Sequence, residues 1–259
     1  MENIMILKHT AQLLVLIAAM VIPYLSIRYY SKKKEPPVIR SLPALNMIPE
    51  MIGRAAEMNA KVLVIPGYSG TLDARLLSGL SILTKASEEA VIKGASVVIP
   101  TARGVFMPLI EAAATAGFTA AGRTDLKADI RFLTDQQFAF AAGVMGLIQR
   151  ENCQANFYVG GFADECLPIT SAGMAIGAVQ IAGDTNMYQL PYFVCTCDYV
   201  MIAEEFLVSG VVLSKDKEQL GGVIGADYLK YFLLLLGVLG VIAASFGSDI
   251  IIQILNYGG

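Results

Sequence analysis

The chain has 259 residues, and 19 lysines and arginines against 22 acidic residues give it a net charge of −3. Nucleic acids are bound by clustered Lys and Arg side chains, so this balance excludes nucleic acid as an expected partner. Charged residues make up 16% of the chain, against about 25% in an ordinary soluble domain, which makes a soluble monomer a poor expectation. The length allows one domain plus membrane segments, without room for two sizeable cores.

The first predicted element is a transmembrane helix over residues 5–29. Residues 11–27 carry no charge, and Met5–Leu7 extend the apolar run toward the roughly 20 residues that a bilayer requires. Pro23 is expected to kink this helix near its inner end. A cleaved signal peptide is the alternative, but it needs basic residues before the apolar run and a small-residue cleavage site after it, and neither is present.

A second transmembrane helix is predicted over residues 229–256, where residues 231–247 are uncharged. Basic residues flank the segment between the two helices, namely Arg28, Lys32, Lys33, Lys34, Arg40, Lys215, Lys217 and Lys230. None follows Gly247, so the positive-inside rule places the central domain in the cytoplasm and both termini outside. The lipid bilayer is therefore an expected partner.

Residues 30–47 are predicted to be a basic, proline-rich linker, and residues 48–228 an α/β domain. Continuous apolar runs typical of strands covered on both faces lie at Val62–Ile65, Ser96–Ile99, Ile130–Leu133, Asn156–Val159, Ala178–Ile181 and Tyr192–Cys197. Helices are predicted at Pro49–Met58, Leu72–Ile92, Phe106–Ala116, Asp135–Gln149, Asp164–Ala175 and Tyr199–Val208. This alternation implies right-handed crossovers, so we expect a Rossmann-like, doubly wound, mainly parallel sheet flanked by the two transmembrane helices.

Local signals predict several helix ends. Thr134 and Gln137 have the spacing of a capping box. Gly94 and Gly117 stand where a left-handed residue would end a helix, and Asp198 is expected to cap the last helix of the domain.

In an open parallel sheet, ligands bind outside the carboxyl ends of the strands. The candidate residues in the loops expected at this rim are Gly67, Ser69, Thr71, Arg103, Thr134, Asp135, Glu165, Asp184, Asn186 and Asp198. The carboxylates could hold a divalent cation or act as general acid and base, although the helix dipole alone favours acidic residues in a first turn. Arg103 could neutralise an anion or pair with a neighbouring carboxylate.

Established catalytic motifs are missing from these loops. The glycine-rich segment at residues 66–71 lacks the lysine of a phosphate-binding loop and the spacing of a dinucleotide fingerprint. The single histidine, His9, lies in the predicted anchor, which leaves no Ser–His or Cys–His arrangement. No catalytic residue and no cofactor are therefore predicted.

The four cysteines, Cys153, Cys166, Cys195 and Cys197, fall in predicted core elements, which agrees with a reducing compartment. A zinc site would need all four thiols to converge, so no metal site is predicted.

Small residues form a stripe on the second membrane helix at Gly237, Gly240, Ala243, Ala244 and Gly247. Such a stripe lets helix backbones approach closely, which predicts helix–helix contact. Two isolated spans cannot enclose a pathway, so transport by a monomer is excluded.

Four segments together resemble a known family: RFLTDQQFAF at 131–140, ANFYVGGFADE at 155–165, VQIAGD at 179–184 and LPYFVCTCDYVMIAEE at 190–205. The chain is similar, over about residues 47–230, to the uncharacterised prokaryotic membrane proteins of the DUF6754 family. The resemblance implies a membrane-anchored domain of unknown function and carries over no catalytic residue. The segments GGFADE and AGDTN look like the family's loops, with Gly161 and Asp184 departing from its usual residues.

These observations favour a membrane-anchored, self-associating scaffold without evident catalysis. One alternative is a membrane-tethered enzyme or sensor that binds a small polar ligand at the rim, with or without a divalent cation. Another is an accessory subunit of a larger membrane complex.

Overall fold

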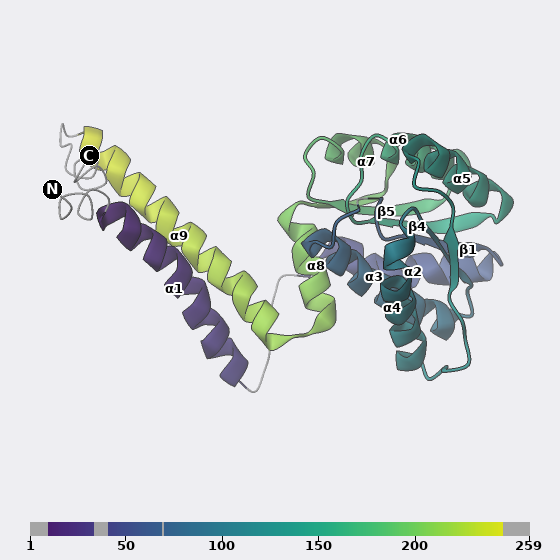
Figure 1. The fold of residues 1–259 in the computed structure, drawn as a ribbon, viewed down its shortest axis with the longest axis horizontal. Coiled ribbons are helices and arrows are strands. Elements are labelled where there is room, and N and C mark those ends of the chain that lie inside the picture. Colours follow the sequence, from purple (N-terminus) through teal and green to yellow (C-terminus); the bar gives the residue numbers. More distant parts are fainter. Residues whose placement is uncertain (1–9, 34–40, 69, 246–259) are drawn as a thin grey trace. The chain divides into compact units, whose positions relative to one another are not determined.

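The computed structural model describes residues 10–33, 41–68 and 70–245. The chain divides into two compact units, one made of residues 39–214 and the other of residues 1–38 together with 215–259. Figure 1 shows the sheet and its covering helices in the first unit and a pair of long helices in the second.

The α/β unit contains one sheet of six parallel strands. They are β1 (Lys61–Ile65), β2 (Val97–Thr101), β3 (Asp129–Phe132), β4 (Cys153–Val159), β5 (Val179–Asp184) and β6 (Tyr199–Ile202). Their order is β3-β2-β1-β4-β5-β6, in which the direction of winding reverses between β1 and β4. This is the strand order of the Rossmann fold, so the predicted α/β, doubly wound, parallel architecture is confirmed.

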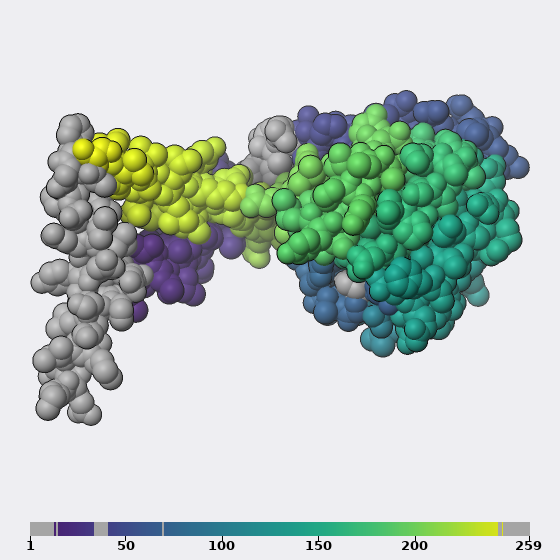
Figure 2. Space-filling model, turned by 90° about the horizontal axis from the view of Figure 1, so that it is seen from above, coloured from purple at the N-terminus to yellow at the C-terminus, as the bar shows by residue number. Residues whose placement is uncertain are grey.

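Helices cover both faces of the sheet (Figure 1). One layer consists of α2 (Pro43–Glu57), α3 (Ala74–Lys93), α4 (Met107–Ala120) and α8 (Glu204–Ser214), and the other of α5 (Gln137–Arg150), α6 (Cys166–Ala175) and α7 (Leu190–Thr196). Val62 and Val64 of β1 pack into the first layer, whereas Leu63 and Ile65 pack into the second. Because successive strand residues point to opposite faces, burial on both faces produces the continuous apolar runs of the sequence. Figure 2 looks onto the layer of α5, α6 and α7, whose side chains cover the sheet.

The predicted strand at residues 192–197 is wrong, and the helix predicted to begin at Tyr199 begins only at Glu204. Residues 190–196 form α7, with Pro191 in its first turn, and the last strand is β6 at Tyr199–Ile202. Ala203, with a φ of 50°, then turns the chain into α8. A short apolar run fits a buried helix as well as a buried strand, which is why the pattern did not separate them.

Three predicted helix ends also need correction. Thr134 forms no capping box: its hydroxyl accepts from the Gln136 amide, which itself precedes α5, and Gln137 donates to Glu165 instead. Gly117 lies inside α4, which continues to Ala120. Asp198 precedes a strand, and its carboxylate accepts from the Gln180 amide at 2.8 Å.

Other features of the helix ends are clear. Gly94 adopts the predicted left-handed conformation after α3, with a φ of 77°. At the other end of α3, the Asp73 carboxylate accepts from the Leu76 amide at 3.1 Å, which is the usual bond of an N-cap. The helix α2 begins at Pro43, earlier than the predicted start at Pro49.

The second unit pairs α1 (Thr10–Lys32) with α9 (Lys217–Ser245) in antiparallel orientation (Figure 1). Gly221 and Gly225 of α9 lie directly against α1, where an added Cβ would come within 3.1 Å of the Ile27 Cα and 2.7 Å of the Pro23 Cα. The Ser26 hydroxyl donates to the Gly221 carbonyl at 2.8 Å. These contacts hold the helices at close range.

Among the described residues, one helical stretch, Lys217–Ile242 of α9, is long and apolar enough to cross a membrane. The two predicted spans are therefore not established. Of the predicted small-residue stripe, Gly237 has no atom of a described side chain within 4 Å of an added Cβ. Gly247 and the side chains of Ala243 and Ala244 lie outside the described residues, and Gly240 is half-buried on α9.

Candidate functional site

At the carboxyl ends of β1 and β4, two glycine-containing loops meet main chain to main chain. The Tyr68 amide donates to the Gly161 carbonyl at 2.8 Å. An added Cβ at Gly67 would lie 2.7 Å from the Gly161 nitrogen, and one at Gly160 would lie 2.6 Å from the Pro66 carbonyl oxygen. Both positions also have positive φ, of 89° and 151°, which glycine tolerates best. Protein backbone therefore occupies the point at which Rossmann folds bind dinucleotides.

Tyr68 links three of the rim loops. Its hydroxyl donates to the Asp135 carbonyl at 2.7 Å, and its ring lies 5.2 Å from the Arg103 guanidinium carbon. The Thr101 hydroxyl accepts from the Arg103 amide at 3.2 Å. Arg103 forms no ion pair with any residue that the structure describes, so of its two predicted roles the carboxylate partner is not found among those residues.

The two central carboxylates of the rim are completely buried. Glu165 accepts from the Gln137 side chain at 2.8 Å and from the Ala163 amide at 2.9 Å. Asp184 accepts from the amides of Phe162, Thr185 and Asn186 at 3.0, 2.6 and 3.1 Å.

Burial raises the pKa of Asp184 above its usual range, although these three amides and the Arg75 guanidinium, 3.8 Å away, oppose the rise. Each oxygen of the two carboxylates accepts from a protein donor. The bond from Phe162 to Asp184 ties the loops after β4 and β5 together, and the bond from Gln137 to Glu165 ties the start of α5 to the loop after β4. Both carboxylates therefore support the loops of the rim.

The remaining rim candidates make local contacts. The Thr71 hydroxyl donates to Asp73 at 3.2 Å, and the Asn186 side chain accepts from the Tyr188 amide at 3.1 Å. Asp198 lies at the amino-terminal ends of the strands, opposite the rim, because it comes just before β6. Ser69 lies outside the described residues. Within the described parts of the chain, no group of three or more His, Cys, Asp or Glu side chains is placed to hold a metal ion.

The rim also carries exposed apolar side chains that the sequence analysis missed. Val105 after β2 and Tyr188 after β5 are 86% and 83% exposed. Other large apolar residues exposed at strand ends, in the loops after them or in the first turn of the next helix are Leu72, Phe132, Phe138, Leu167, Met187 and Ile202. Each strand has at least one of them at its carboxyl end or in the segment that follows it. The sequence contained part of this signal, since Val105, Met187 and Tyr188 fall between the predicted strands and helices. The other exposed apolar residues fall inside predicted helices or, for Phe132, inside a predicted strand, where burial is the usual expectation.

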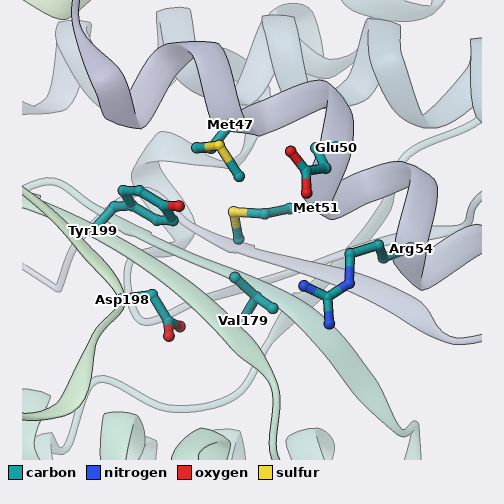
Figure 3. Close-up of a pocket in the computed structure, with 7 residues that line it drawn as sticks. All are labelled: Met47, Glu50, Met51, Arg54, Val179, Asp198 and Tyr199. Carbon is teal, nitrogen blue, oxygen red and sulfur yellow. The ribbon is translucent and has the colours of Figure 1, made fainter.

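At the amino-terminal ends of the strands, which we call the amino edge of the sheet, two adjoining pockets of about 350 and 490 Å³ open beside the starts of β5 and β6. Both are lined by Arg54, Val179 and Asp198. Figure 3 shows Arg54 reaching from α2 toward Val179, with Met47 and Met51 forming an apolar wall. The Arg54 guanidinium forms no ion pair or hydrogen bond with a described residue, so this groove offers a free cation.

The family model of a domain of unknown function, DUF6754, matches residues 1–255. No curated protein and no solved structure matches the chain. The resemblance noted in the sequence is thus confirmed, and it extends over nearly the whole chain.

Proposed function

We propose that this chain, which belongs to the DUF6754 family, is a membrane-anchored assembly protein whose α/β unit associates with further copies of itself. The observation that carries the proposal is the composition of the strand-end rim, where the two central carboxylates, Glu165 and Asp184, are buried and bonded to protein donors while large apolar side chains are exposed. Gathered, exposed apolar residues mark surfaces that other molecules cover.

A second copy is the occupant that the rim suits best. Exposed Asp135 and Asp164 lie at the same edge as the half-buried Arg103. A two-fold contact sets the same patch against itself, so an arginine of one copy can meet an acidic residue of the other while the apolar residues pack between them. Anchoring in one membrane would further raise the local concentration of the partners.

The proposed anchor is the α1 and α9 pair. Apolar side chains such as Leu16, Met20, Leu234 and Val241 remain exposed on these helices, as expected of side chains that face lipid. The basic residues Arg28, Lys32 and Lys33 lie at the end of α1 that pairs with the start of α9. By the positive-inside rule, this end and the α/β unit are cytoplasmic in our proposal.

The test is the mass of the gently extracted full-length protein, measured by native mass spectrometry. We expect a closed homo-oligomer for the natural sequence and loss of subunits in the double variant Val105→Asp, Tyr188→Asp, because charges in an apolar contact are costly. The matched control is Ile92→Asp, which alters an equally apolar exposed residue near the end of α3. A monomer of 27.7 kDa for the natural sequence would overturn the proposal, and a foreign subunit would favour the accessory role.

The groove at the amino edge favours a second candidate, a sensor or enzyme for a small ligand. The groove is lined by the unpaired cation of Arg54, the carboxylates of Glu50 and Asp198, and an apolar wall. This lining suits a small molecule that carries a carboxylate for Arg54, a cationic group for the two carboxylates and an apolar body. Thermal unfolding across a panel of small carboxylates would test this role. Stabilisation that disappears in Arg54→Gln would support it, and unchanged midpoints at millimolar ligand would count against it.

A further inference from the structure

The helix pair carries a second candidate site. A cavity of about 310 Å³ opens between α1 and α9 and is lined by Tyr24, Ile27, Arg28, Ser31, Lys32 and Glu218. Five of these residues belong to α1 and are spaced by three or four along it, so they share one face of that helix. The sixth, Glu218, comes from the first turn of α9.

The chemistry of the cavity changes along α1. Tyr24 and Ile27 form an apolar wall on the side of the apolar part of the helix, and Arg28 and Lys32 follow toward its basic end. Neither of these two cations forms an ion pair or a hydrogen bond with a described residue. Glu218 offsets one of the two positive charges, but its carboxylate already accepts from the Ser31 hydroxyl at 3.2 Å. The cavity therefore keeps a net positive charge with two free cationic groups.

We propose that this cavity binds the phosphate of an anionic phospholipid, with Arg28 and Lys32 on the phosphate and an acyl chain along Tyr24 and Ile27. The proposal rests on the membrane anchoring proposed above. The apolar wall of the cavity continues along α1 into exposed apolar side chains such as Met20 and Leu16. A free phosphate would contact only the cationic end of the cavity, whereas a phospholipid would contact both the cationic end and the apolar wall. Basic pockets between membrane helices on the cytoplasmic side are known to bind anionic lipid headgroups.

Lys33 provides a matched control on the same helix end. Its ammonium group lies 4.9 and 5.3 Å from the ring centroids of Tyr29 and Tyr30, and it does not line the cavity. Lys33→Gln removes the same charge as Lys32→Gln from the neighbouring position. It therefore separates binding in the cavity from general attraction to an anionic surface.

The experiment reconstitutes the full-length protein in nanodiscs of phosphatidylcholine with phosphatidylglycerol and counts the lipids retained in native mass spectrometry. We expect preferential retention of phosphatidylglycerol. The double variant Arg28→Gln, Lys32→Gln should weaken this retention by about 30-fold, because each cation contributes about fivefold. Lys33→Gln should retain the lipid as the natural sequence does, and Glu218→Gln should retain it more strongly.

Four outcomes would overturn the proposal. Equal loss in Lys33→Gln would assign the effect to general surface charge, and displacement by millimolar inorganic phosphate would assign the site to free phosphate. Recovery of the protein in the soluble fraction without detergent would remove the anchoring on which the site depends. Stable anchoring without any preference for phosphatidylglycerol would overturn the lipid site alone and leave the proposed function standing.

Discussion

Burial controls the chemistry of three of the four cysteines. It raises the pKa of each of the Cys153, Cys166 and Cys197 thiols to about 12, so these thiols stay protonated at neutral pH, and a protonated thiol is a poor nucleophile. Cys195, near the end of α7, is exposed. We therefore expect iodoacetamide at pH 8 to modify Cys195 in the folded protein and the other three only after unfolding. Peptide mass spectrometry would check this, and equally fast labelling of Cys166 would contradict it.

Glu151 connects the acid stability of the fold to the amino edge of the sheet. Hydrogen bonds from Lys61 and Arg131 lower its pKa from 4.5 to about 2. A carboxyl whose folded pKa is lowered contributes stability above its unfolded pKa and loses it as the pH falls through the folded pKa. The free energy of unfolding should therefore decrease between pH 4.5 and pH 2.

In Glu151→Gln, the free energy of unfolding should be lower at pH 7 and should fall less steeply in acid. Urea titrations at a series of pH values would measure both effects. Glu111→Gln is the control, because Glu111 is exposed on α4 and forms no ion pair with a described residue. An acid limb with the same slope in Glu151→Gln as in the natural sequence would refute the assignment.

At single positions, the sequence predicted the location of the polar residues better than their hydrogen-bond partners. The strand ends that carry Glu165 and Asp184 were predicted, and both residues lie at the rim. Their partners were not predictable, because the donors come from loops brought together by the sheet, such as Gln137 for Glu165 and Phe162 for Asp184. A carboxylate whose oxygens accept protein hydrogen bonds supports the loops and leaves little capacity for a ligand.

At the scale of elements, α3 is packed closely by two neighbouring helices. An added Cβ at Gly117 of α4 would lie 2.3 Å from the Thr84 carbonyl oxygen, and one at Gly210 of α8 would lie 2.7 Å from the Ser78 Cα. Glycine costs helix stability but permits such contact between backbones. Sequence patterns favoured a helix end at Gly117 because they record local preference and contain no information on the neighbouring helix.

This packing predicts the sign of a mutation. Gly→Ala in an unconstrained helix stabilises by about 0.5–1 kcal/mol, but Gly117→Ala forces α3 and α4 apart and should destabilise by about 2 kcal/mol. Gly104→Ala is the control, since nothing lies within 4 Å of its added Cβ, and it should stay within about 0.5 kcal/mol. Urea unfolding of the full chain in detergent would compare the two. A stabilised Gly117→Ala would show that the helices are less closely packed than described.

For the molecule as a whole, the sequence predicted the fold class correctly and the parallel sheet with it. Strand order was not predictable, because nothing in the spacing of apolar runs states that β1 pairs with both β2 and β4. The contact between α1 and α9 was missed for a related reason. Gly221 and Gly225 precede Asp227 and Lys230, in a part of α9 that was assigned to the α/β domain because of its charges.

Mutations at Gly225 and at Gly237 of α9 should therefore distinguish the pairing of α1 with α9 within one chain from association between chains. Gly225→Leu adds a side chain where a Cβ already lies 2.7 Å from Pro23, so it should lower the thermal unfolding midpoint of the detergent-solubilised protein. Gly237→Leu adds one where nothing lies within 4 Å, so it should leave the midpoint unchanged. If Gly237 contacts another copy, as small residues on membrane helices commonly do, Gly237→Leu should instead reduce the mass found by native mass spectrometry. An unchanged mass would limit self-association to the α/β unit, and a lowered midpoint would place Gly237 in the contact between α1 and α9.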